Sequence, residues 1–403
     1  MFAYRTMVLA VPAAMAETGL AMLGEAPRTV VIDRDGLQAL LEALGARGYT
    51  LIAPTVRDGA IVYDEVEAVD DLPAGVTEVQ GPGSYRLSKR DDAALFGYAV
   101  GPHSWKKYLF RPETVLFRAR LDPDGGFVSS RADDGVAPRY AFLGVRACEI
   151  AAIDIQDQVF LRGSYRDPDY GSRRDGAFVI AVQCGEPGGT CFCVSMHTGP
   201  RAESGFDLAL TELIDAQRHE LLVEVGSERG EQILGDVPSR PALPGDLSAA
   251  RAVTDDAASR MGRTLEADGL PQRLAEVLEH PQWDDVASRC LACTNCTLVC
   301  PTCFCSSVED TTDLTGTEAT RTRKWDSCFT LGHSYIHGGS IRASTRDRYR
   351  QWLTHKLSTW VDQFGTSGCV GCGRCITWCP VGIDLTAEVR ALLTPAGASE
   401  VLP

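Results

Sequence analysis

The sequence predicts an α/β or α+β domain in the first part of the chain and an α-helical domain after it. Short apolar runs alternate with helix-forming stretches up to about residue 236, an order that is typical of sheets covered by helices. From residue 256 onward the pattern is mainly helical. Between the two parts, residues 237–255 carry three prolines and a glycine, a composition that is typical of loops between domains.

Each element of the first domain is predicted from its own residues. Runs rich in β-branched and aromatic residues predict strands, and a run of alanine and leucine that ends at a glycine predicts a helix. Strands are expected at 29–33, 49–53, 58–63, 140–145 and 177–183, and helices at 36–47, 149–161 and 208–216. In the second domain, helices are expected at 270–280, 283–288 and 349–364.

These elements divide the chain into five parts: an extension at 1–27, an α/β domain at 28–236, a linker at 237–255, a helical domain at 256–390 and a tail at 391–403. The extension carries Arg5, a short apolar stretch and the Ala14-Met15-Ala16 triplet, which together resemble a secretory signal. Because Pro12 interrupts the apolar stretch, the alternative is a disordered or over-extended start, with Met15 or Met22 as the initiator.

Two cysteine runs lie in the helical domain. One is Cys290-x2-Cys293-x2-Cys296-x3-Cys300-Pro301, and the other is Cys369-x2-Cys372-x2-Cys375-x3-Cys379-Pro380. This is the spacing of bacterial ferredoxins, in which soft thiolates ligate the irons of 4Fe–4S clusters. Zinc usually takes two separated cysteine pairs, and disulfides would need an oxidising compartment and would leave one of the 15 cysteines unpaired. We therefore predict two 4Fe–4S clusters and a ferredoxin-like helical domain.

The spacing also predicts which thiol holds which cluster. In two-cluster ferredoxins, the fourth cysteine of each run ligates the other cluster. This rule assigns the first cluster to Cys290, Cys293, Cys296 and Cys379, and the second cluster to Cys369, Cys372, Cys375 and Cys300. The exchange of fourth ligands ties the two runs into one folding unit.

Four further cysteines predict a third 4Fe–4S cluster in the α/β domain. Cys148 ends one predicted strand, and Cys184, Cys191 and Cys193 follow another strand in a glycine-rich loop. Ligands can converge at strand ends, and four thiols suffice for one cluster. The alternative is that these cysteines pack in the core as small hydrophobic residues.

Three cysteines, Cys303, Cys305 and Cys328, follow the first run less regularly. In the interpretation that we favour, they line the cluster cavity without bonding to iron. They could instead ligate a further cluster together with a residue such as His333, or replace Cys148 in the third set.

The composition excludes several classes of function. The net charge is −15 and the pI is about 5.0, which argues against a nucleic-acid partner. No apolar run reaches the roughly 18 residues of a membrane span, and neither a Gly-x-Gly-x-x-Gly motif nor a phosphate-binding loop is present. We predict no catalytic residues and no cofactor other than the clusters, and therefore an electron relay.

Basic residues gather at 321–324 and 342–356, close to the cysteine runs in sequence. A solvated surface is their ordinary explanation. The alternatives are positive charge that raises the reduction potential of a cluster and a docking patch for an acidic redox partner.

Six segments resemble the β subunit of cytoplasmic sulfhydrogenases, which are NAD(P)-linked nickel–iron hydrogenases, and the related A subunit of anaerobic sulfite reductase. They are 101–106, 144–148, 191–200, 290–305, 325–328 and 369–380. The cysteine runs are shared by many electron-transfer proteins. Cys-Phe-Cys-Val-Ser-Met at 191–196 and Cys-Pro-Thr-Cys-Phe-Cys at 300–305 are far more specific.

The resemblance implies a cytoplasmic, non-catalytic subunit of an oxidoreductase complex. It would relay electrons between a flavin/NAD(P)-binding subunit and the hydrogenase small subunit, with the large subunit also present, and with flavin and nickel–iron on those partners only. The segment at 101–106 favours the hydrogenase branch. The alternatives are the A subunit of an anaerobic sulfite reductase and a structural or redox-sensing iron–sulfur protein.

Overall fold

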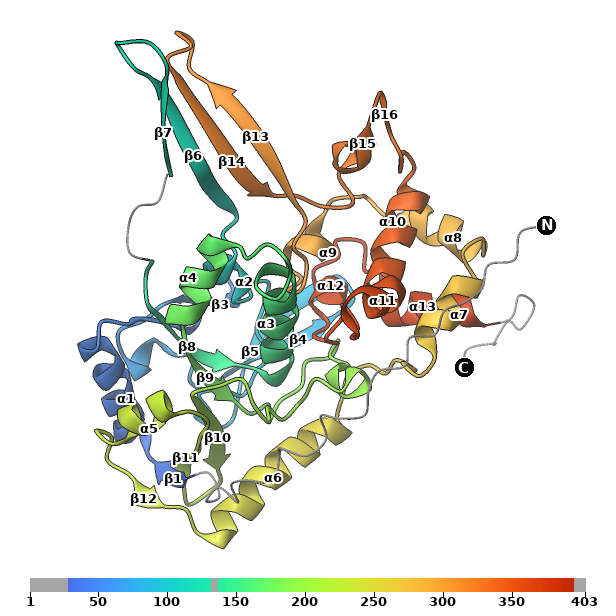
Figure 1. Ribbon diagram of the computed structural model, residues 1–403. Helices are drawn as coiled ribbons and strands as arrows, with labels where there is room; N and C mark the ends of the chain where they lie inside the picture. The colour runs from blue at the N-terminus through green and yellow to red at the C-terminus, as the bar shows by residue number, and fades with distance from the viewer. Residues whose placement is uncertain (1–27, 132–136, 395–403) are drawn as a thin grey trace, which may run out of the picture.

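The computed structural model describes residues 28–131 and 137–394. The extension at 1–27, with the predicted signal or over-extended start, lies outside the described residues, as does the tail from 395 onward. The predicted fold class is confirmed, because a large sheet with helices forms the N-terminal part and a mainly helical region follows it (Figure 1).

The main sheet contains eight strands in the order β12-β1-β11-β10-β9-β8-β2-β3. Its central strands β10, β9, β8 and β2 run parallel, whereas the remaining neighbours are antiparallel. The strands are β1 (Thr29–Ile32), β2 (Thr50–Arg57), β3 (Ala60–Glu65), β8 (Tyr140–Val145), β9 (Phe178–Val182), β10 (Leu208–Ile214), β11 (His219–Val225) and β12 (Arg240–Pro241).

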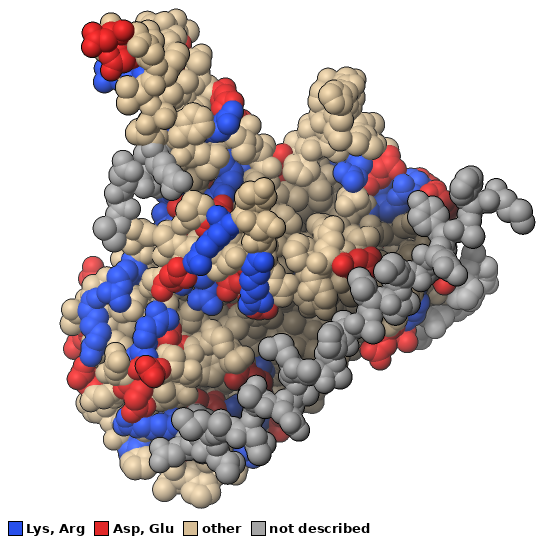
Figure 2. All heavy atoms as spheres, in the orientation of Figure 1, with Lys and Arg blue, Asp and Glu red and all other residues tan. Residues whose placement is uncertain are grey.

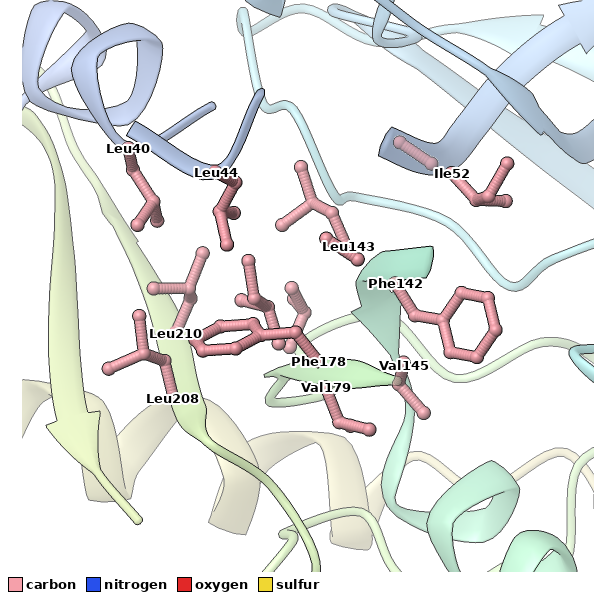
Figure 3. Packing of buried hydrophobic residues seen from close by; sticks show 14 of the residues in the cluster. Leu40, Leu44, Ile52, Phe142, Leu143, Val145, Phe178, Val179, Leu208 and Leu210 are labelled. Atoms are coloured by element: carbon pink, nitrogen blue, oxygen red, sulfur yellow. The ribbon is translucent and has the colours of Figure 1, made fainter. Parts of the chain in front are cut away.

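Helices cover both faces of this sheet. Val30 and Ile32 of β1 pack in the core with α1 (Arg34–Ala46) and α5 (Glu228–Leu234). The intervening Val31 packs against α6 (Pro244–Ser259), because successive side chains of a strand point to opposite faces. Figure 3 shows how Leu40 and Leu44 of α1 lie over the sheet residues. The helix α3 (Ala147–Phe160) follows β8, and α4 (Pro168–Gly176) precedes β9.

One predicted helix is wrong. In place of a helix at 208–216, Leu208–Ile214 form strand β10, which pairs with β9 and β11. Leucine, alanine and glutamate favour helices, but Leu210 packs in the core beneath α1 and Leu213 packs in the α6 cluster on the other face. A strand buried on both faces has no clear polar alternation, so its sequence resembles that of a buried helix.

The predicted linker at 237–255 takes part in the sheet domain. It contributes β12 to the sheet edge and the first turns of α6 to one face. Pro244 stands in the first turn of α6, where its missing N–H costs no hydrogen bond. Two prolines of this stretch therefore lie in regular elements, Pro241 at the end of β12 and Pro244 at the start of α6.

A second sheet, which the sequence did not predict, joins the two parts of the chain. Its order is β13-β14-β6-β7, from β6 (Glu113–Leu121), β7 (Phe127–Arg131), β13 (Ser306–Thr312) and β14 (Glu318–Trp325). β14 from the helical region pairs with β6 from the α/β region. This arm projects from the body of the molecule, as does the smaller finger of β15 (Tyr335–Ile336) and β16 (Gly339–Ser340) (Figures 1 and 2).

The remaining elements surround a second hydrophobic core that includes Trp283, Tyr349, Trp352 and Ile376. They are the helices α7 (Leu270–Glu276), α8 (Gln282–Arg289), α9 (Asn295–Leu298), α10 (Thr345–Thr354), α11 (Trp360–Phe364), α12 (Arg374–Thr377) and α13 (Leu385–Leu393), with a π-helical turn at His355–Thr359 between α10 and α11. The hairpin of β4 (Val76–Gly81) and β5 (Ser84–Lys89) and the short helix α2 (Lys106–Leu109) belong to the α/β part. Among the described residues, no helix is long and apolar enough to cross a membrane.

Candidate metal centres

The two cysteine runs adopt the same backbone conformation. In the first run, Ala292 and Thr294 have φ angles of 51° and 70°, and in the second run the matching Gly371 and Gly373 have 64° and 72°. This left-handed conformation is uncommon for residues other than glycine. It turns each loop so that the N–H two residues after the first cysteine points back at its sulfur, at 3.4 Å from Ala292 N to Cys290 Sγ. Hydrogen bonds of this kind stabilise thiolate ligands and influence their potential.

The first cavity brings together the four thiols predicted for the first cluster. It is lined by Cys290, Cys293, Cys296 and Cys379, and also by Cys375. Cys379 therefore lies with the first run although it belongs to the second. Apolar walls from Phe329, Tyr349, Trp352 and Leu385 line this cavity, which is partly open to solvent. Burial raises the pKa of the Cys296 thiol, whereas binding to iron would deprotonate it.

The second set gathers around Cys300. Its thiol interacts electrostatically with Cys369, Cys372 and Cys375, which are the three partners predicted for it. The Lys356 ammonium lies 3.1 Å from Cys300 Sγ and also bonds Thr302 Oγ1 at 2.9 Å. Hydrogen bonding by Cys303, reinforced by the charge of Lys356, holds the pKa of Cys300 well below its usual value. The buried ammonium of Lys356 thus lies beside Cys300, a predicted cluster ligand.

The third cavity lies where the α/β part meets the second run. It is lined by Cys148, Cys184, Cys191 and Cys193, together with Cys372. Burial raises the pKa of each of these four thiols. Two buried guanidinium groups, Arg146 and Arg374, also line the cavity. The donor set and its positive surroundings fit an anionic thiolate cluster.

Close packing of glycines brings the second run against the third cavity. A Cβ on Gly373 would lie 2.3 Å from the carbonyl oxygen of Thr190, and one on Gly371 would lie 2.6 Å from that of Phe192. The Phe192 N–H donates to the Gly371 carbonyl at 2.8 Å. No side chain fits at these two positions, so glycine is what allows the Cys191–Cys193 loop to contact the second run.

A buried carboxylate, Glu149, links the two parts of the molecule. Its Oε1 accepts from Arg374 Nη2 at 2.5 Å, and its Oε2 accepts from the Tyr63 hydroxyl at 2.5 Å and from Trp105 Nε1 at 3.1 Å. The Glu149 and Arg374 side chains are only 1% and 6% exposed. Removing either one would leave the other charge buried without its counterion. This pair was not predicted from the sequence, although Glu149 follows Cys148 and Arg374 lies between two ligand candidates.

The three remaining cysteines lie beside the second set. Cys303 interacts electrostatically with Cys300, while Cys305 interacts electrostatically with Cys328 and His333. Among the described residues, no group of three or more His, Cys, Asp or Glu side chains is arranged to hold a single metal ion. Ten of the twelve candidate ligands line the first or the third cavity, and these include Cys375 and Cys372 of the second set.

Known proteins resemble this chain in two ways. Residues 289–383 match the family model of a 4Fe–4S dicluster domain. The chain is also 34% identical over 287 residues to the sulfhydrogenase 2 subunit beta of Pyrococcus furiosus, and the alignment covers 69% of this chain and 79% of that protein. The alignment is thus much longer than the dicluster region. The prediction of two 4Fe–4S clusters is confirmed by the dicluster match, whereas the third cluster and the individual ligands stay predictions.

Proposed function

Because the chain belongs to the sulfhydrogenase β-subunit family, we propose that it relays electrons between a flavin subunit that handles NAD(P) and the small subunit of a nickel–iron hydrogenase. It is an iron–sulfur electron-transfer subunit of a sulfhydrogenase-like complex. The observation that carries the proposal is that the three sets of candidate cluster ligands lie next to one another, since cysteines of the second set also line the first and the third cavity. The hydrogenase large subunit, the nickel–iron centre and the flavin belong to partner chains.

Two cysteines of the second set support a linear order for the relay. Cys372 lines the third cavity, and Cys375 lines the first cavity. Cys372 also interacts electrostatically with Cys148, Cys191 and Cys193. Electrons would therefore pass between the third and the first centre by way of the second. A bound 4Fe–4S cluster supplies the one-electron chemistry, and the protein supplies the thiols, their spacing and the surrounding charge.

The first cavity has the properties of the end that faces a partner. Cys293 is exposed, and Leu291 and Val381 on the cavity wall are 64% and 41% exposed. Exposed apolar residues next to a redox centre favour a protein interface at that point. The aromatic walls on the inner side, Tyr349 and Trp352, are buried and exclude water from the rest of the cavity.

An anaerobic affinity purification of the full chain from its native host tests this function, with the co-purifying chains identified by mass spectrometry. We expect nickel–iron large and small subunits together with a flavin chain. Recovery of a sirohaem subunit would instead assign the chain to sulfite reduction. Recovery of the iron-loaded chain alone, with no partner at low salt, would contradict the relay and favour a structural or sensing role.

A second test addresses the relay directly. Addition of NAD(P)H and the purified flavin chain should bleach the iron–sulfur absorbance of this chain near 400 nm. A matched variant, Leu291→Asp, places a charge on the exposed wall of the first cavity and should weaken docking at that end without loss of iron. Equal rates of electron exchange with the partner at that end would contradict the assignment of this surface.

A further inference from the structure

Residues 101–106 of the α/β part contact both cysteine runs. At the start of this segment, the Gly101 carbonyl accepts from Arg374 Nε of the second run at 3.1 Å. At its end, the Lys106 ammonium donates to two carbonyls of the first run, that of Leu298 at 3.2 Å and that of Thr297 at 3.5 Å. Six consecutive residues thus connect the α/β part to the loops that carry the predicted ligands of the first and second clusters.

The two carbonyls that Lys106 binds lie between ligand candidates of different clusters. Thr297 and Leu298 are the last residues of α9, and the last carbonyls of a helix have no partner within it. Cys296 precedes them and is predicted to hold the first cluster, whereas Cys300 follows them and is predicted to hold the second. The Lys106 ammonium is therefore fixed on the short link that joins the two centres.

The contacts of Lys106 fit its charged form. An ammonium has three N–H donors and no acceptor, and here two carbonyls accept from it. The same Nζ lies over the Trp325 ring, 4.1 Å from the ring centroid, a position in which the ring face attracts a cation. The Trp325 ring is held in place by a hydrogen bond of 3.1 Å from its Nε1 to the Phe110 carbonyl. Lys106 is only 4% exposed, so water screens this charge little.

A buried ammonium needs a compensating negative charge. Burial lowers the pKa of Lys106, and the neighbouring thiols of Cys303 and Cys300 act against this effect, whereas the ammonium of Lys356 adds to it. A cluster held by four thiolates is anionic, and it gains one more negative charge when it is reduced. The bound clusters would therefore supply the compensating charge, and they would supply more of it in the reduced state.

We propose that Lys106 is a positioning residue of the relay, whose ammonium fixes the link between Cys296 and Cys300 and makes the first and second centres easier to reduce. Lys356 differs from it, because its ammonium contacts the sulfur of Cys300 itself and so acts mainly on the second centre. The use of these potentials rests on the proposed function. The potentials themselves can be measured without a partner chain.

An EPR-monitored redox titration of the full chain, purified anaerobically with its iron, tests this proposal. Lys106→Gln keeps N–H donors for the two carbonyls but removes the charge. At a fixed potential it should lower the ratio of reduced to oxidised cluster by about tenfold in both centres, which corresponds to a shift of about 59 mV toward more negative potential for one electron. The signals are assigned by their loss in Cys293→Ser for the first centre and in Cys369→Ser for the second.

Two matched variants separate the charge from the side chain that carries it. Lys106→Arg keeps the positive charge and should keep both potentials close to those of the native chain. Lys107→Met removes the next charge along the chain, whose Nζ donates to the Tyr63 carbonyl at 2.8 Å within the α/β part, and should leave both potentials unchanged. The signal that Cys193→Ser removes, from the predicted third cluster, should not shift in any of these variants.

Three outcomes would overturn the proposal. Native potentials in Lys106→Gln would show that the charge has no effect, and an equal shift in Lys107→Met would show that the effect does not depend on the link. Loss of iron in both Lys106→Gln and Lys106→Arg would show that the shape of the lysine side chain is needed rather than its charge. A chain that recovers no hydrogenase partner would contradict the relay but would leave these potentials as they are, so the two failures can be told apart.

Discussion

Single side chains decide how each predicted thiolate is stabilised, and Lys356 is the clearest case. Burial alone would lower its pKa, but the neighbouring Cys300 thiol raises the pKa of Lys356 well above the usual value, so the ammonium is charged. The sequence placed Lys356 in a basic group whose ordinary explanation was a solvated face. The structure buries it, since this residue is only 4% exposed, and the alternative of a charge that adjusts a cluster becomes the better explanation.

Replacing this cation should lower a reduction potential. A positive charge stabilises the more anionic, reduced form of a cluster, so Lys356→Met should shift the midpoint potential of one cluster to a more negative value. An EPR-monitored redox titration measures this shift. Lys324→Met is the control, because Lys324 pairs with Glu309 on the arm and its side chain is 41% exposed. Equal potentials in the two variants would rule out a role for Lys356 in adjusting the cluster.

At the scale of elements, the two cysteine runs form a single unit. Cys379 lines the cavity of the first run, and Cys300 interacts with the thiols of the second. We expect Cys379→Ser to remove or alter the same EPR signal that Cys293→Ser removes, although the two residues lie in different runs. A change confined to the signal of the second set would show that the exchange of fourth ligands is wrong.

The Glu149–Arg374 pair joins elements that are far apart in sequence. Glu149→Gln leaves the Arg374 guanidinium buried without its counterion, which should cost about 3–5 kcal/mol of unfolding free energy. The exposed Glu309→Gln, which loses its contact with Lys324, should cost about 0–1 kcal/mol. Thermal unfolding of the iron-loaded chains followed by circular dichroism compares them. Similar midpoints would mean that the buried pair does not hold the two parts together.

Some elements could be predicted from the sequence because local patterns determine them. The strand of β-branched residues at Thr29–Ile32 and the helix over 349–364 are examples, although a π-helical turn interrupts the latter. The strand at Leu208–Ile214 was mistaken for a helix because both of its faces are buried. The β13–β14 arm was missed because its polar, alternating residues are ordered by pairing with β6, a contact between distant parts of the chain.

The candidate site, too, was predictable from the sequence only where local geometry determines it. Cysteine spacing predicted which thiols would share the first cavity, because the loop geometry is local and repeats in both runs. The charges that surround the thiols depend on tertiary contacts. Arg146 and Arg374 reach the third cavity from different parts of the fold.

In the whole molecule, the sheet domain and the helical domain both contribute residues to the third cavity. The third cavity takes its cysteines from the sheet domain, but Cys372 and Arg374 on its wall come from the second run. The shared arm and the Glu149 contacts fix the two parts against each other. The proposed relay through three centres would depend on this fixed arrangement, because electrons would have to pass the boundary between the parts.

An iron count on the anaerobically purified full chain, combined with EPR during stepwise reduction, is the most direct test of the proposed three-centre relay. We expect about twelve iron atoms per chain, four for each of three 4Fe–4S clusters, and three reducible centres. Cys193→Ser should lower the count by about four and remove one centre while the other two remain. About eight iron atoms in the native chain, with no change in Cys193→Ser, would contradict the three-centre relay.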